Sequence, residues 1–124
     1  MGKERRRRRS SDARRALSYQ LAHVRDEACL EALVLADGDG LVLAEAGERE
    51  LCESLAALAP LVTQGAMPCA HDLPASYVQV RTVVYDGTPL YLASCTESFA
   101  DTMSARMEAW LEHTRDGVRR ILAA

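Results

Sequence analysis

The chain has 124 residues, of which 48% are hydrophobic and 27% charged, the composition of one ordinary globular domain. Its longest apolar run is far shorter than the roughly 20 residues that a membrane-spanning helix needs. No apolar segment follows the N-terminal arginines, as it would in a secretory signal, so we expect a cytoplasmic protein.

The net charge of −3 conceals two regions of opposite charge. Residues 1–15 carry eight basic and two acidic side chains, a charge of +6, whereas residues 16–124 carry seven basic and 16 acidic ones, a charge of −9. So dense a basic run cannot pack without counter-charges, so we predict a disordered arm over residues 1–10 and a folded domain over residues 11–124. The arm either binds nucleic acid or an anionic membrane weakly, or is a solvated tail. The residues that would bind such polyanions are Arg5, Arg6, Arg7, Arg8 and Arg9.

The first predicted elements are a helix and a hairpin. The helix starts near Ser11 or Asp12, either of which can cap its first turn. Its apolar stripe comprises Leu17, Leu21, Val24 and Ala28. Two apolar runs, residues 30–36 and 41–46, then flank Asp37-Gly38-Asp39-Gly40, a sequence typical of a tight hairpin turn. Both faces of these strands are apolar, so we expect the hairpin to be covered on both sides.

A second helix follows Gly47 and leads into an irregular stretch. Its predicted stripe comprises Leu51, Leu55, Leu58 and Val62. Pro60 lies in the last turn and limits how far the helix continues. Residues 63–76 contain two prolines and a glycine, so we expect at most a short edge strand near residues 66–70.

A second hairpin and a last helix complete the chain. Residues 78–85 and 90–95 are predicted strands joined around Asp86-Gly87. Ser98 and Asp101 resemble a cap for the last helix. Its predicted stripe, which Thr114 interrupts, comprises Phe99, Met103, Met107, Trp110, Val118 and Ile121. The predicted fold is therefore an α/β (α+β) sandwich, an antiparallel sheet of four to five strands with helices on both faces.

No motif in this sequence carries chemistry. The four cysteines, Cys29, Cys52, Cys69 and Cys95, are scattered, so we expect reduced thiols rather than a metal site. Only Cys69 and His71 are closely spaced. Read as a calcium loop, Asp37-x-Asp39-Gly40 would place Leu41 where an oxygen ligand is required, so a turn is favoured. Without a phosphate loop, dinucleotide fingerprint or nucleophile elbow, we predict no cofactor, no catalytic residue and no enzyme activity.

With this order of elements, the chain resembles the Roadblock/dynein light chain domain family. The resemblance rests on Leu30-Glu-Ala-Leu-Val-Leu-Ala-Asp-Gly-Asp-Gly-Leu-Val-Leu-Ala44, which is similar to the first hairpin of that family. The leucine- and alanine-rich second helix, the second hairpin and the last helix extend it over roughly residues 14–122. The family has five strands, and the sequence departs from it over residues 63–76, where the family has its middle strand.

The resemblance implies a non-catalytic adaptor or regulator that forms a homodimer and binds a small Ras-like GTPase or another roadblock-fold protein. Some bacterial members of the family act as GTPase-activating partners. The contact surface it implies is the exposed side of the second helix, opposite Leu51, Leu55 and Leu58. The residues expected on that surface are Arg49, Glu50, Glu53 and Ser54.

Two other functions remain open from the sequence. One is a ligand-sensing module of the related profilin-like and GAF-like sandwiches, which requires a pocket between sheet and helix. The other is a polyanion tether that works through the arginine-rich arm.

Overall fold

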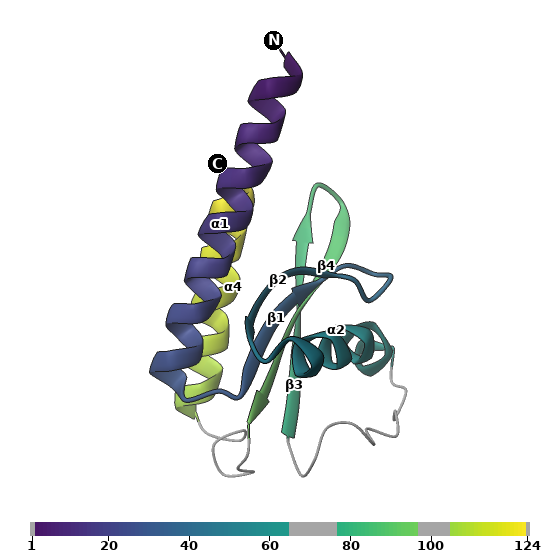
Figure 1. Cartoon of the computed structure of the whole chain (residues 1–124). Coiled ribbons are helices and arrows are strands. Elements are labelled where there is room, and N and C mark those ends of the chain that lie inside the picture. Colours follow the sequence, from purple (N-terminus) through teal and green to yellow (C-terminus); the bar gives the residue numbers. More distant parts are fainter. Residues whose placement is uncertain (1, 65–76, 97–104, 124) are drawn as a thin grey trace.

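The computed structural model describes residues 2–64, 77–96 and 105–123 (Figure 1). The helices are α1 (Gly2–Ala28), α2 (Arg49–Thr63) and α4 (Ala105–Ala123). The strands are β1 (Ala32–Ala36), β2 (Val42–Gly47), β3 (Tyr77–Tyr85) and β4 (Thr88–Thr96). Within the described residues they form one four-stranded antiparallel sheet of order β2-β1-β4-β3. The predicted order of elements and the predicted sheet are confirmed.

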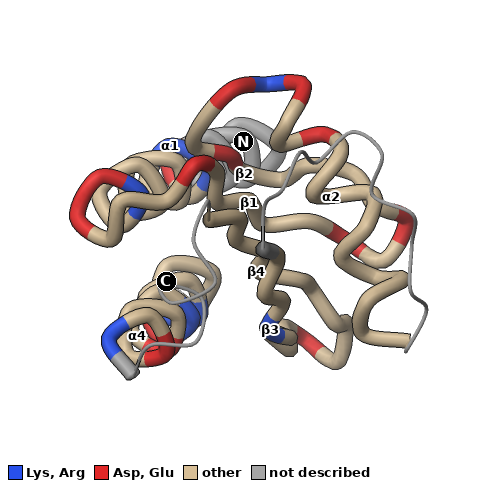
Figure 2. Tube along the Cα trace, turned by 90° about the horizontal axis from the view of Figure 1, so that it is seen from below, with Lys and Arg blue, Asp and Glu red and all other residues tan. Residues whose placement is uncertain are grey.

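Helices cover the sheet on both faces. Viewed along the helix pair, α1 and α4 lie on one side of the sheet and α2 lies on the other (Figure 2). All five residues of the central strand β1 are fully buried. Leu33 and Leu35 pack in the core beneath α1 and α4. Ala32, Val34 and Ala36, which point to the other face of the sheet, pack beneath α2. Both faces of this strand are apolar because helices cover both, as predicted.

Both hairpin turns depend on aspartate and glycine. The Asp37 carboxylate accepts hydrogen bonds from the backbone N–H groups of Asp39 and Leu41, at 2.9 and 3.0 Å. This closes the first turn as an Asx-type turn and confirms that reading over a calcium loop. In the second turn Asp86 and Gly87 both have positive φ angles, 51° and 76°, as a two-residue hairpin turn requires.

α2 presents a different face to the sheet from the one predicted. Of the predicted stripe, only Leu55 is fully buried, while Leu51 and Leu58 are half-buried and Val62 is exposed. The small side chains beside Leu55 lie against the sheet instead and allow the helix to approach it closely. The buried residues are Cys52, Leu55, Ala56, Ala59 and Pro60.

The buried stripe of α4 includes the threonine that was expected to interrupt it. Thr114 is fully buried between Leu111 and Val118, and its hydroxyl donates to the Trp110 carbonyl oxygen at 2.7 Å. This local hydrogen bond satisfies the hydroxyl and allows burial. Trp110, predicted to lie on the stripe, is half-buried. The expected cap at residues 98–101, the expected strand near 66–70, and Cys69 and His71 lie outside the described residues.

α1 begins at Gly2. This differs from the predicted helix start at Ser11 or Asp12, whereas the disorder expected of residues 1–10 stays a prediction. Arginine is among the better helix formers, and no proline or glycine interrupts residues 3–28. The helix already built on the core can therefore propagate through the arginine run, since adding a residue to an existing helix avoids the cost of nucleation.

Candidate interaction surface

The four residues predicted to contact a partner all lie on the first turns of α2. Arg49, Glu50 and Glu53 are exposed, and Ser54 is half-buried. The Arg49 Nε atom lies 3.3 Å from Glu53 Oε1, an ion pair between residues four apart on the same side of the helix. Because both side chains are largely in water, this pair adds little to stability. It presents one positive and one negative group side by side.

The exposed side of α2 continues from these charges into apolar residues. Residues 49, 53, 57 and 61 follow one another at intervals of four and form a single ridge along the helix. The ridge ends at Leu61, whose exposed fraction is 43%, and the adjacent Val62 is 36% exposed. The surface is therefore charged at the start of the helix and apolar at its end.

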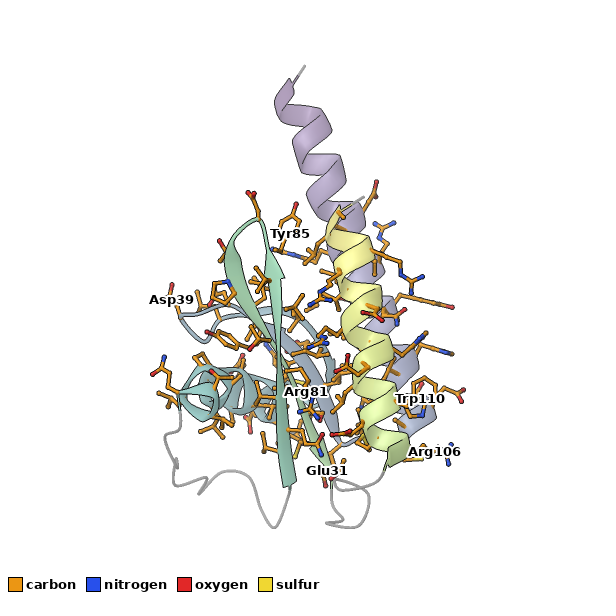
Figure 3. The ribbon with its side chains drawn as sticks, turned by 180° about the vertical axis from the view of Figure 1, so that it is seen from behind. Glu31, Asp39, Arg81, Tyr85, Arg106 and Trp110 are labelled. Carbon is orange, nitrogen blue, oxygen red and sulfur yellow. The ribbon has the colours of Figure 1, made fainter. Side chains whose placement is uncertain are left out.

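The turn between β1 and β2 lies against the middle of this ridge. A side chain at Gly40 would place its Cβ atom 3.1 Å from the Cα atom of Ala57, so the close approach and the φ of +81° both require glycine. Leu41, the next residue, is 63% exposed. Asp39 lies at the tip of the same turn (Figure 3). Turn and helix together thus place exposed leucines beside charged groups.

Sequence patterns missed the apolar part of this surface. Leu41 was counted as the first residue of a buried strand, but β2 begins only at Val42. The predicted stripe includes Val62 as a residue that faces the sheet, whereas Val62 is exposed. Leu61 belongs neither to that stripe nor to the predicted contact residues. No signal in the sequence marks Leu41 as exposed, since an apolar residue that follows a turn glycine can also be the first buried residue of a strand.

The Cys52 thiol is unsuited to nucleophilic chemistry. Cys52 and Cys95 are fully buried, and Cys29 is exposed. Burial, assisted by the nearby negative charge of Glu45, raises the pKa of the Cys52 thiol to about 11. A thiol that stays protonated at neutral pH is a poor nucleophile and a poor metal ligand. Among the described residues, no three His, Cys, Asp or Glu side chains are grouped to hold a metal ion.

The arginines predicted to bind polyanions are separate from the α2 surface. Arg5 to Arg9 belong to the first turns of α1, a helix that packs on the face of the sheet opposite to α2 (Figures 1 and 2). On that side, β3 and α4 are linked by an ion pair between Arg81 and Glu108, at 3.4 Å. None of the helices in the described part of the chain is both long and apolar enough to cross a bilayer.

Comparison with known proteins gives a relative in structure only. No family model matches the chain, and no curated protein matches its sequence. Among solved structures, Myxococcus xanthus MglB superposes with a TM-score of 0.57 at 12% sequence identity, covering 87% of this chain and 88% of that chain. At this identity the likeness establishes a shared fold: the chain is an antiparallel α+β sandwich of the roadblock-like type.

Proposed function

We propose that this protein is a non-catalytic cytoplasmic adaptor that binds a small Ras-like GTPase or another roadblock-fold protein through the exposed side of α2. The observation that carries the proposal is the surface formed by α2 and the β1–β2 turn, which has exposed apolar residues, Leu41, Leu61 and Val62, and, at the start of the helix, the exposed Arg49–Glu53 pair. Apolar side chains that gather on a surface beside charged groups are typical of protein-binding sites.

The fold and the chemistry of the chain support the same proposal. The roadblock-like fold shared with MglB agrees with the resemblance of the first hairpin, although a fold by itself leaves function open. The perturbed thiol at Cys52 is explained by burial in the core rather than by a reactive site. Recognition of another protein is therefore a better match to this molecule than catalysis.

The first test is capture of a partner in defined nucleotide states. The full chain is immobilised and exposed to extract of its native cell with either GDP or a non-hydrolysable GTP analogue, and bound proteins are identified by mass spectrometry. We expect a small GTPase that binds in one nucleotide state, or a roadblock-fold protein. Recovery of neither class would refute the proposed function.

The second test exchanges the two charges on α2. In the double variant Arg49→Glu with Glu53→Arg, the ion pair is kept in the more favourable order, acid before base, so the helix should stay intact. We expect affinity for the captured partner to fall by on the order of 1 kcal/mol, about fivefold, because charges at an interface mainly tune recognition. Isothermal titration with the purified partner measures the change.

The matched control exchanges another exposed pair on the far side of the sheet. Asp116 and Arg119 lie on α4, with 3.9 Å between Asp116 Oδ1 and Arg119 Nη1. The variant Asp116→Arg with Arg119→Asp should bind the partner like the wild type. If the α2 exchange leaves affinity unchanged, or if both exchanges weaken it equally, the α2 surface is not the binding site.

A further inference from the structure

The N-terminal part of α1 extends beyond the rest of the molecule. Leu17 is the first residue of α1 that joins the hydrophobic core. At about 1.5 Å per residue, the preceding residues 2–16 form roughly 22 Å of helix. This segment passes the C-terminal end of α4, which runs antiparallel to α1 (Figures 1 and 3). The first turns of α1 thus form a projection, whereas Ala13, which is half-buried, already lies against the body.

The projection and the body have opposite charge. Residues 1–15 carry +6, and residues 16–124 carry −9. Arg9 precedes Leu17 by eight residues, or about 12 Å of helix, which exceeds the roughly 8 Å screening length of physiological salt. A continuous helix therefore keeps the arginines beyond most of the repulsion that the acidic body exerts on an anionic partner.

The sequence of the projection favours a partner that surrounds it. Five consecutive residues, Arg5 to Arg9, occupy positions 100° apart and so cover the whole circumference of the helix. Residues 2–16 contain no apolar residue larger than alanine, whereas a helix that lies in a membrane surface needs an apolar face. A flat bilayer also meets only one side of a helix. A groove of double-stranded DNA carries phosphates on both sides.

We propose that the projecting part of α1 docks in a groove of double-stranded DNA and binds its phosphates without reading base sequence. The major groove of B-form DNA, about 12 Å wide, admits an α-helix. This inference is independent of the proposed partner of α2, because the helices α1 and α2 cover opposite faces of the sheet. One molecule can therefore hold DNA and a protein partner together.

The test uses the full chain and a labelled DNA duplex of about two helical turns. Fluorescence anisotropy is measured between about 50 and 200 mM salt. If all five arginines contact phosphates, the logarithm of affinity should fall with the logarithm of salt concentration with a slope of about −4.5. Substituting Arg5 to Arg9 by glutamine, which preserves helix propensity, should weaken binding at least tenfold and reduce the slope. The matched control substitutes three exposed α4 arginines by glutamine and should change neither value: Arg106, Arg119 and Arg120.

A second variant separates helix from charge. Ser10→Pro retains every arginine but breaks the helix between the arginines and the body, so we expect binding several-fold weaker than wild type. Unchanged affinity in this variant would overturn the docked helix, and unchanged affinity in the glutamine variant would overturn the site. Tighter binding to vesicles of phosphatidylcholine with phosphatidylserine, or to duplex RNA, than to the DNA duplex would overturn the choice of partner. Loss of the α2 partner would leave these results unaffected.

Discussion

Gly47 is the residue where the first hairpin gives way to α2, and its backbone admits no side chain. Its φ is +123°, and an added Cβ atom would lie 2.7 Å from the Glu31 carbonyl oxygen and 3.1 Å from the Ala32 Cα atom. Ala32 belongs to β1, and the backbone N–H of Glu31 donates a hydrogen bond to the Cys95 carbonyl oxygen at 2.9 Å, so neither atom can move aside cheaply. The position therefore combines conformational strain with a steric clash.

We predict that Gly47→Ala lowers the free energy of unfolding by about 2 kcal/mol or more, measured by urea denaturation. Gly38→Ala is the matched control, because Gly38 lacks a positive φ and nothing lies within 4 Å of its added Cβ atom. That variant should stay within about 0.5 kcal/mol of wild type. Equal stability of the two variants would contradict this account of Gly47.

Cys52 should make the protein less stable in alkaline solution. Burial raises the pKa of this thiol in the folded chain from its ordinary value of 9.0 to about 11. Below pH 9 the thiol is protonated in both states. Between pH 9 and 11 the unfolded chain releases the proton while the folded chain keeps it, so stability falls as pH rises.

The expected loss is on the order of 2 kcal/mol between pH 9 and 11, measured by urea denaturation at a series of pH values. The quantity to compare is the slope of the free energy of unfolding against pH in wild type and in Cys52→Ala. The variant should lose less stability over this range than the wild type does. Identical slopes would show that the buried thiol does not govern this pH dependence.

At the scale of elements, sequence patterns correctly predicted which segments form helices and strands. They were less accurate about which face of each helix packs against the sheet. The hairpins were readable because their turns are local: Asp37 closes its own turn through two hydrogen bonds within four residues. The orientation of α2 was not readable, because the helix is apolar on more than one side. Both the predicted stripe and the observed one run through Leu55, and only packing against β1, β2 and β4 chooses between them.

Local interactions explain two other differences between prediction and structure: the burial of Thr114 and the early start of α1. A threonine in an apolar stripe looks like an interruption until its hydroxyl is seen to bond to Trp110 one turn earlier. The helix begins at Gly2 rather than near Ser11, because the helix propensity of arginine and the attachment to an existing helix favour continuation. For the candidate site, the sequence located the charged residues of α2, whereas Leu41 and Leu61 required the structure.

The arm should contribute little to the stability of the domain. Deleting residues 2–10 removes no residue of the described hydrophobic core, which begins in α1 at Leu17, so we expect Tm to change by no more than a degree or two. Leu21→Ala supplies the contrast, because Leu21 is fully buried and its truncation should cost about 2–5 kcal/mol. Differential scanning calorimetry compares the three proteins. A large fall in Tm after the deletion would mean that residues 2–10 contribute to the stability of the fold.

At the scale of the whole molecule, we predict a homodimer, since two-fold dimers are the commonest assembly of folded chains. Within the described sheet β2 and β3 are the edge strands, and β3 presents Val84, which is 57% exposed, so the monomer leaves strand edge and apolar surface available for pairing. Sedimentation velocity at micromolar concentration should show twice the mass of the chain. A monomer at that concentration and at about ten times more would contradict the prediction.

Sedimentation of the α2 exchange variant, Arg49→Glu with Glu53→Arg, then shows whether the α2 surface lies in the dimer interface or is free to bind the partner. If the variant remains a dimer while losing its partner, α2 faces outward in the assembly and each dimer offers two binding sites. If the variant becomes a monomer, α2 belongs to the dimer interface, because a charge exchange in water-exposed residues should not otherwise disturb the fold. Partner binding would then have to be mapped to another face of the dimer, and the proposed α2 contact would be withdrawn.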